Sequence, residues 1–333
     1  MLTNNREARE RSVVILGAGG FLGIAVTKAA VDAGLTAIGV VRQPQAAKSV
    51  ECAGGVAVLG DAARPESWLS HATRAIAVID VVQPKIPRRL GNRALAQIVA
   101  QRVAATQAIV AGLTSIPANG RPLYVNVSGV AELLPDRHGF ISDASPLTSR
   151  PAGFAKIGLG ARRVARDSGI DAAFVHIGTV YGPGKSFAER ILPALERGRY
   201  PIFGKGENRI ALVHVDDAAR ALVHVARLER TEAKIASWIV VDQSALTLAA
   251  FLTQTAAAIG GPRPRRVPSW IGRVILGSGL MAELAKDVPT NANRVRASGF
   301  EFQFPQFRDG LAATLSALGR SSSAQAMNAE VHT

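Results

Sequence analysis

Short, continuous apolar runs alternate with longer segments of helical periodicity through most of the chain. The first two runs are SVVILG at 12–17 and TAIGVVR at 36–42, and the last is ASWIVVD at 236–242. Continuous runs of this length are typical of strands that are buried on both faces of a parallel sheet. The other runs of this kind lie at 56–61, 75–83, 122–128 and 171–180. The pattern predicts an α/β fold with a doubly wound parallel sheet.

The alternation loosens after residue 184, and this change suggests how the chain is organised. We predict a nucleotide-binding core over 12–184, with 208–245 returning to its sheet. A smaller, mostly helical substrate-binding part then comprises 185–207 and 246–318. The polar, low-hydrophobicity ends of the chain are expected to be disordered, and they cover residues 1–11 and 320–333.

Composition narrows the class of protein. The chain has 333 residues, 48% of them hydrophobic, which is enough for a sizeable core. Cys52 is the only cysteine, so no disulfide can form within the chain and a cysteine-based metal site is not expected. The start of the chain is polar, and no uncharged apolar run reaches the roughly 18 residues of a membrane-spanning helix. We therefore expect a cytoplasmic protein with no membrane span.

The formal net charge of +14 raises the question of an anionic partner. The arginines are scattered, and the one short basic cluster, GGPRPRRVP at 260–268, has no interleaved aromatic residues for base stacking. We therefore expect no nucleic-acid partner. The charge fits a surface rich in arginine and a preference for phosphorylated or anionic small molecules.

A glycine-rich segment, GAGGFLG at 17–23, directly follows the first predicted strand and opens a helix. In this context glycines allow a tight turn, a close approach of the backbone to a pyrophosphate, and close helix packing. The N-terminus of the helix then offers free N–H groups to the phosphates. The candidate cofactor-binding residues of this segment are Gly17, Ala18, Gly20, Phe21, Leu22 and Gly23.

The end of the second predicted strand indicates which dinucleotide is bound. An NAD-binding protein usually places an acid there to accept the ribose hydroxyls, whereas this chain has Arg42 in VVRQ. A guanidinium suits a 2′-phosphate, so NADP is favoured, with NAD as the alternative. Asp61, which ends the third predicted strand, is a candidate acceptor for the adenine amino group.

Several motifs together resemble the extended short-chain dehydrogenase/reductase family, which includes NAD-dependent epimerases and dehydratases. They are GAGGFLG, HIGTVYGPG at 176–184, RIALVHVDDAARAL at 209–222 and SGFEFQFPQFRDGL at 298–311. The similarity spans about residues 12–315. It implies a Rossmann fold, a nicotinamide cofactor and a substrate pocket formed with the C-terminal part.

The resemblance also implies a catalytic set, in which one member is missing. The family places a tyrosine four residues before a lysine, and a serine near the end of the fifth strand. Lys156 falls in the lysine position and Ser128 in a serine position, but residue 152 is alanine. Lys156 is thus implied to hold the nicotinamide ribose. Its apolar neighbours predict partial burial and a lowered pKa, with which the lysine could itself move a proton.

The loop at 134–151 offers a replacement for the missing acid. His138 is the candidate, because the unperturbed pKa of histidine lies nearest neutrality. An ordinary polar loop is the alternative. Tyr181 belongs to the HIGTVYGPG motif and is not expected to replace the tyrosine.

Three functions stay open at this point. The first is an NADP-dependent carbonyl or enone reductase, or a dehydrogenase, with a non-standard proton donor and a small, largely apolar substrate. The second is a non-redox, epimerase- or dehydratase-like enzyme, and the third is a non-catalytic NADP-binding sensor.

The apolar segment 267–289 is a candidate lid, packing helix or membrane-surface helix. A homodimer through the predicted helices at 92–113 and 155–169 is a further expectation from the resemblance.

Overall fold

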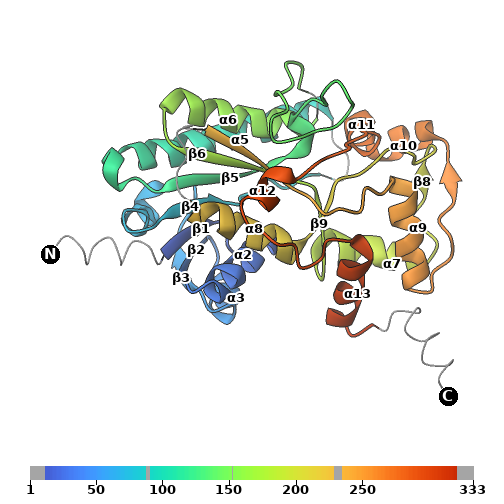
Figure 1. Cartoon of the computed structure of the whole chain (residues 1–333), viewed down its shortest axis with the longest axis horizontal. Coiled ribbons are helices and arrows are strands. Elements are labelled where there is room, and N and C mark those ends of the chain that lie inside the picture. The colour runs from blue at the N-terminus through green and yellow to red at the C-terminus, as the bar shows by residue number, and fades with distance from the viewer. Residues whose placement is uncertain (1–11, 88–90, 152, 229–234, 321–333) are drawn as a thin grey trace.

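The computed structural model describes residues 12–87, 91–151, 153–228 and 235–320 (Figure 1). The seven predicted strands form one fully parallel sheet in the order β10-β6-β5-β4-β1-β2-β3, which confirms the predicted fold class. Their bounds are β1 Ser12–Leu16, β2 Thr36–Val41, β3 Val56–Leu59, β4 Ala77–Asp80, β5 Leu123–Gly129, β6 Ala172–Ile177 and β10 Ile235–Val240.

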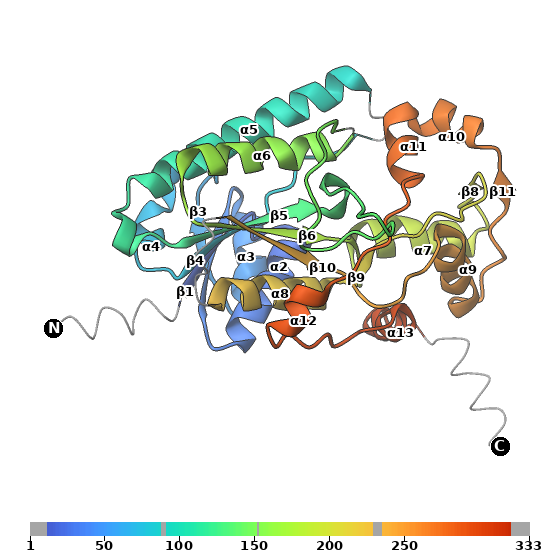
Figure 2. The ribbon, with the colours of Figure 1, turned by 45° about the horizontal axis from the view of Figure 1, so that its top comes forward.

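Helices cover both faces of this sheet (Figure 2). One face carries α2 (Phe21–Asp32), α3 (Pro44–Cys52) and α8 (Val215–Arg227). The opposite face carries α4 (Leu69–Ala72), α5 (Asn92–Thr114) and α6 (Ala155–Ser168). Because both faces are covered, β1 and the central strands are buried along their whole length, and this is why their sequences are continuously apolar.

The strand register aligns the carboxyl ends of the central strands. Leu16 at the end of β1 lies opposite Asp80 of β4, and Asp80 lies opposite Asn126 of β5. The order β3-β2-β1-β4-β5-β6 is that of dinucleotide-binding sheets, in which ligands bind outside the carboxyl ends of the strands. The glycine-rich turn after β1 and the end of β5 are therefore two strand spacings apart, about 10 Å.

The C-terminal part is mostly helical, as predicted. It adds two small parallel pairs, β7 with β9 and β8 with β11. The stretch RIALVHV contributes the short strand β9, which lies outside the main sheet. Residues 186–196 form a π-helix followed by α7, which accommodates Pro193 in its first turn. The bounds are β7 Thr179–Tyr181, β8 Ile202–Phe203, β9 Leu212–His214, β11 Arg266–Val267, α7 Leu192–Glu196, α9 Leu248–Ala258, α10 Ser269–Leu276, α11 Ser278–Leu284, α12 Asn293–Ala297 and α13 Phe307–Ala317. Single-turn helices are η1 Pro65–Ser67, η2 Ala118–Gly120 and η3 Val130–Glu132, and the π-helix η4 spans Ser186–Ile191.

Two carboxylates attach this part to the core. Asp217, fully buried in α8, accepts the backbone N–H groups of Gln303 and Phe304, both at 2.8 Å. Glu283 of α11 accepts the N–H of Phe154 at 3.2 Å, directly before α6 begins. The C-terminal segments are thus held on the same sheet edge as the nucleotide-binding turn.

The predicted tails lie largely outside the described residues. The exception is Arg320, which forms an ion pair with Glu196 of α7 and therefore belongs to the folded part.

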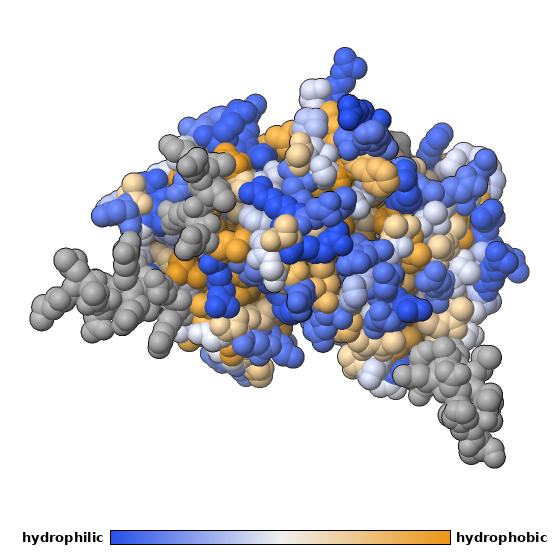
Figure 3. Space-filling view, in the orientation of Figure 1, coloured by the Kyte–Doolittle hydropathy of each residue, from blue (hydrophilic) through white to orange (hydrophobic). Residues whose placement is uncertain are grey.

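One described helix, α5, is long and apolar enough to cross a membrane by length and composition, and a third of its apolar stretch is buried inside the protein. It packs against α6 and the sheet, as in Figure 2, and its Arg102 is buried in the core. The face seen in Figure 3 mixes hydrophilic side chains with scattered apolar areas.

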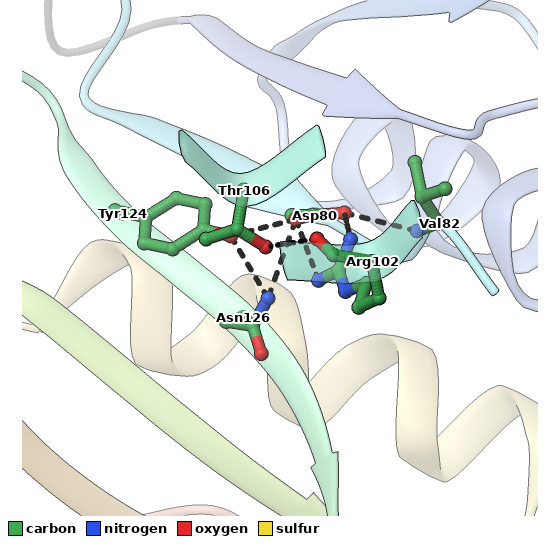
Figure 4. A network of polar contacts seen from close by, with 6 residues as sticks. All are labelled: Asp80, Val82, Arg102, Thr106, Tyr124 and Asn126. Carbon is green, nitrogen blue, oxygen red and sulfur yellow. Dashed lines mark hydrogen bonds and ion pairs between the residues drawn. The ribbon is translucent and has the colours of Figure 1, made fainter. Parts of the chain in front are cut away.

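A buried ionic network joins three elements beneath the carboxyl edge of the sheet (Figure 4). Asp80, which is fully buried, receives both terminal nitrogens of Arg102 at 3.2 and 2.8 Å. It also accepts the Tyr124 hydroxyl at 2.7 Å, the Asn126 amide at 3.2 Å and the backbone N–H of Val82 at 3.0 Å. Burial is the largest single influence on Arg102 and lowers its pKa, but the charges of Asp80 and Tyr124 and the hydrogen bonds to both together outweigh burial, so the net pKa is raised.

We expect Arg102→Met to lower the free energy of unfolding by about 3–5 kcal/mol, because it leaves the Asp80 carboxylate buried without its counter-charge. Urea denaturation measures this change. The matched control is Arg166→Ala, which removes an exposed arginine paired with Asp167 and should cost less than about 1 kcal/mol. Equal stability of the two variants would contradict the structural role of the buried pair.

Candidate functional site

The glycine-rich turn forms a cradle that side chains would fill. Gly17 has a φ of +82°, which favours glycine, and its carbonyl accepts the Gly20 N–H at 3.0 Å. A Cβ on Gly23 would lie 2.7 Å from Cα of Ala18, so only glycine lets α2 approach β1 this closely. The tight turn and the close helix packing are therefore present as expected, and the approach of a pyrophosphate to this turn stays a prediction.

The N-terminus of α2 is open to an anion. It begins after Gly20 with no side-chain cap and no acid in its first turn, where Phe21 and Leu22 stand. The first N–H groups of the helix and its positive dipole end therefore remain available to a phosphate. The Phe21 ring lies 3.0 Å from where a Cβ on Gly184 would stand, so the HIGTVYGPG motif borders the turn. The residues present fit a dinucleotide.

Arg42 and Asp61 lie at the same edge of the sheet. Arg42 is exposed directly after β2, where a guanidinium can reach a ribose phosphate. Asp61 follows β3 and is half-buried. One of its carboxylate oxygens accepts the Ala63 N–H at 2.9 Å, so this oxygen is committed to a turn. Only the other oxygen is left for an adenine amino group.

Ser128 and the start of α6 are brought together at the end of β5. A Cβ on Gly158 would lie 2.7 Å from Oγ of Ser128, so α6 lies directly against the serine. Lys156 stands two residues earlier in the first turn of α6. The side chain of Lys156 is exposed, which corrects the expectation that its apolar neighbours bury it. Those neighbours, Ala155 and Ile157, are themselves buried and leave the lysine on the outer side. Residue 152 lies outside the described part of the chain.

The sequence favours His138 over Tyr181 as a replacement acid, and the structure gives the surroundings of both residues. His138 lies in an exposed turn closed by Asp136, and its ring accepts a hydrogen bond from Arg137 Nε at 3.0 Å. Tyr181 is 1% exposed and packs edge-on against Phe187 and other rings of the C-terminal part. Burial raises the pKa of Tyr181 well above its usual value, so this tyrosine is unsuited to proton transfer.

Sequence reasoning missed one acidic residue of the site, Glu132. It ends η3, four residues after Ser128, and is only 2% exposed. Its Oε1 accepts the Ser128 hydroxyl and the Gly129 N–H, the latter at 3.2 Å. The signal was present as an acid in the otherwise apolar stretch VNVSGVAELL, but only the fold shows that it is buried against the serine.

Burial changes the ionisation of this cluster. It raises the pKa of Glu132 from 4.5 to about 7, against the opposing effects of the Ser128 and Gly129 hydrogen bonds. It lowers the pKa of His176, the register partner of Ser128 on β6, to about 4. His176 is therefore neutral at pH 7, and its Nδ1 lies 3.9 Å from Oε2 of Glu132.

The segment predicted as a lid or packing helix forms α10 and α11. Met281 is buried and packs close to Gly272, whereas Trp270, Val274 and Ile275 are exposed by 59–64%. One side of α10 therefore packs on the C-terminal part and the other faces outward. The packing of the inner side is therefore observed, and a role of the segment as a lid or a membrane-surface helix stays a prediction.

We expect Glu132→Gln to become more stable relative to the wild type as the pH rises. The pKa of Glu132 is raised from 4.5 to about 7 in the folded protein. The protonated carboxyl therefore stabilises the folded wild type fully below about pH 4.5, and this contribution is lost as the pH rises through about 7. The difference at pH 9 should be on the order of 3 kcal/mol at most. Thermal unfolding of both proteins at pH 5, 7 and 9 measures it, and a difference that does not change with pH would refute the raised pKa.

Comparison with solved structures shows the same fold in several enzymes. A human epimerase family protein, SDR39U1, solved with NADPH, is 22% identical, with a TM-score of 0.73 over 92% of this chain and 99% of that chain. The dTDP-glucose 4,6-dehydratase DesIV of Streptomyces venezuelae, solved as a double mutant with NAD and a second ligand, is 19% identical, with a TM-score of 0.70 over 92% and 96%. The UDP-glucuronic acid 4-epimerase of Bacillus cereus, in complex with UDP-glucuronic acid and NAD, is 14% identical, with a TM-score of 0.71 over 92% and 98%. At these identities the similarity establishes the fold alone.

None of the curated proteins compared with the chain matches it. A family model does, and it covers residues 13–236, about two thirds of the sequence. This range contains the glycine-rich turn, Ser128, Glu132 and Lys156. The chain belongs to the NAD dependent epimerase/dehydratase family.

Proposed function

We propose that the protein is an NADP-dependent oxidoreductase that acts on a small, largely apolar carbonyl compound or alcohol. The observation that carries the proposal is the position of α6, which lies against Ser128 at the end of β5. The first turn of this helix, with Lys156, thus stands at the same sheet edge as the open N-terminus of α2. Both features lie at the edge of the sheet outside which dinucleotides bind in folds of this kind.

The cofactor assignment is supported by residues of this chain. Gly17, Gly20 and Gly23 form the cradle for a pyrophosphate, and Arg42 offers a cation where a 2′-phosphate would lie. When bound, the nicotinamide supplies or accepts a hydride. Lys156, exposed at the start of α6, is free to hold the nicotinamide ribose.

Proton transfer has to differ from the family pattern, because residue 152 is alanine and Tyr181 is buried in the C-terminal part. Ser128 remains as the hydroxyl at the family position. This arrangement favours hydride transfer to or from a carbonyl carbon with a proton route that does not use tyrosine. Turnover of a substrate without net oxidation of NADPH would instead support an epimerase- or dehydratase-like enzyme.

The first test is NADPH oxidation with a panel of aldehydes, ketones and enones. We expect turnover by the wild type and a loss of about 100-fold in kcat/KM for Lys156→Ala, since the lysine would orient the ribose and assist proton transfer. Arg166→Ala, another exposed cation of α6, is the matched control and should keep the wild-type rate. Micromolar NADPH binding with no turnover of any substrate would favour the sensor function.

A second test addresses the choice of dinucleotide. Arg42→Ala should weaken NADPH binding by about 10- to 100-fold and leave NADH binding nearly unchanged, because only NADPH loses a charge-assisted hydrogen bond. Fluorescence titration of both dinucleotides measures this ratio. Lys48→Ala removes an exposed cation of the nearby α3 and serves as the control. Equal weakening of both dinucleotides would rule out recognition of the 2′-phosphate by Arg42.

A further inference from the structure

Glu132 is a buried acid to which the proposed function has so far given no role. One of its carboxylate oxygens, Oε1, accepts the Ser128 hydroxyl and the Gly129 N–H. The other, Oε2, is buried and has no hydrogen-bond partner in the described part of the chain. A buried carboxylate with an unpaired oxygen is costly when ionised, so this position favours a group that can hold a proton.

The charged and titratable groups around Glu132 do not neutralise it. His176 on β6 is bonded through Nδ1 to the Gly129 carbonyl at 3.2 Å, and since a carbonyl only accepts, Nδ1 carries the proton. This leaves a neutral imidazole beside Oε2. Arg162 on α6 and Arg102 on α5 both act to lower the pKa of Glu132. Arg102, however, is already paired with Asp80. Arg162 lies over the Phe174 ring, 4.8 Å from its centroid, and its Nη1 is buried with no hydrogen-bond partner in the described part of the chain. Its charge lowers the pKa of Glu132 by less than burial raises it.

The helix that carries Lys156 closes over this acid. A Cβ on Gly158 would overlap Oε1 of Glu132, so glycine is what allows α6 to rest on the Ser128–Glu132 pair. The pair is therefore enclosed between β5, β6 and the first turns of α6. Ser128 is 7% exposed and Glu132 2%, so the serine is the more accessible member.

We infer that Glu132 is the proton acceptor and donor behind Ser128, and that the two residues together take over proton transfer from the missing tyrosine. The inference rests on the proposed function. Glu132 would not touch the substrate; it is a positioning residue that acts through the serine hydroxyl. The observed direction of the hydrogen bond, from Ser128 to the carboxylate, is the one required for removal of a proton from an alcohol.

In the oxidation of an alcohol, the substrate loses one proton from its hydroxyl and one hydride from its carbon. The substrate hydroxyl proton moves to Oγ of Ser128 while the serine proton moves to Oε1 of Glu132. The hydride leaves the substrate carbon with its electron pair for the oxidised nicotinamide, and the carbon–oxygen double bond forms. In the direction of reduction, the protonated Glu132 returns the proton through Ser128 to the carbonyl oxygen.

The test is the variant Glu132→Gln, which keeps the acceptor oxygen for Ser128 but cannot take up a proton. We expect kcat to fall about 100-fold while NADPH affinity stays within about twofold. In the wild type, the rate of alcohol oxidation should rise with pH to a plateau above about 7, because the carboxylate is the acceptor. This dependence should vanish in Glu132→Gln and return in part in Glu132→Asp.

Asp242→Asn is the matched control. Burial raises the pKa of Asp242 to about 7 as well, but this carboxylate accepts the Ser244 N–H after β10, outside the Ser128 cluster. The variant should therefore keep the wild-type rate and pH profile. Unchanged rate and pH profile in Glu132→Gln would overturn the relay and leave the proposed function standing. A wild type that turns over no substrate would overturn the proposed function, and the relay with it.

A readout that does not depend on turnover is the infrared carboxyl band of the NADPH-bound protein, recorded across the pH range. We expect a protonated carboxyl band that disappears with a midpoint near 7 and has two components, because burial raises the pKa of both Glu132 and Asp242 to about 7. Glu132→Gln should remove one component and Asp242→Asn the other. If removing Glu132 leaves this titrating band unchanged, the relay is overturned even where the variant is slow, because the loss of rate would then be structural.

Discussion

The buried ion pair between Asp80 and Arg102 is the interaction on which the rest of the site depends. It joins the end of β4 to α5, and the Tyr124 and Asn126 side chains attach β5 to the same carboxylate. The N–H of Val82 is held by Asp80 as well, and Val82 lies within 3.2 Å of where a Cβ on Gly17 would stand. The position of the nucleotide-binding turn therefore follows from the position of this carboxylate.

Asp80 and Glu132 are both buried near the carboxyl edge of the sheet, but they differ in their hydrogen-bond donors. Asp80 receives donors on both oxygens, including a guanidinium in a two-pronged arrangement, so it serves as a rigid centre. Glu132 has donors on one oxygen only, and its nearest titratable neighbour, His176, is neutral. The first arrangement fixes the positions of the side chains around Asp80, and in the second, burial raises the pKa of Glu132 to about 7. A rigid polar network on β4 thus lies near a carboxyl in η3 that can change its protonation close to neutral pH.

The sheet, the glycine-rich turn and the helix with Lys156 lie in the part of the chain that the epimerase/dehydratase family model matches. Two further features of this chain lie close to the end of β5 and the start of α6. Alanine stands at residue 152, while an acid is buried four residues after Ser128. The C-terminal part is held to the core through Asp217 and Glu283, of which the latter binds the backbone at the start of α6. α11 is therefore bonded directly to the segment that leads into α6.

The sequence alone determined the fold class, all seven strands of the main sheet, the turn at Gly17–Gly23 and the place of Arg42 after β2. These features are local, because apolar runs, glycines and their order along the chain predict them without information about distant residues. The exposure of Lys156, the burial of Glu132 and the network around Asp80 were decided only by tertiary structure. Burial and hydrogen-bond partners come from segments tens of residues apart, so the charge state of a carboxylate cannot be inferred from its neighbours in sequence.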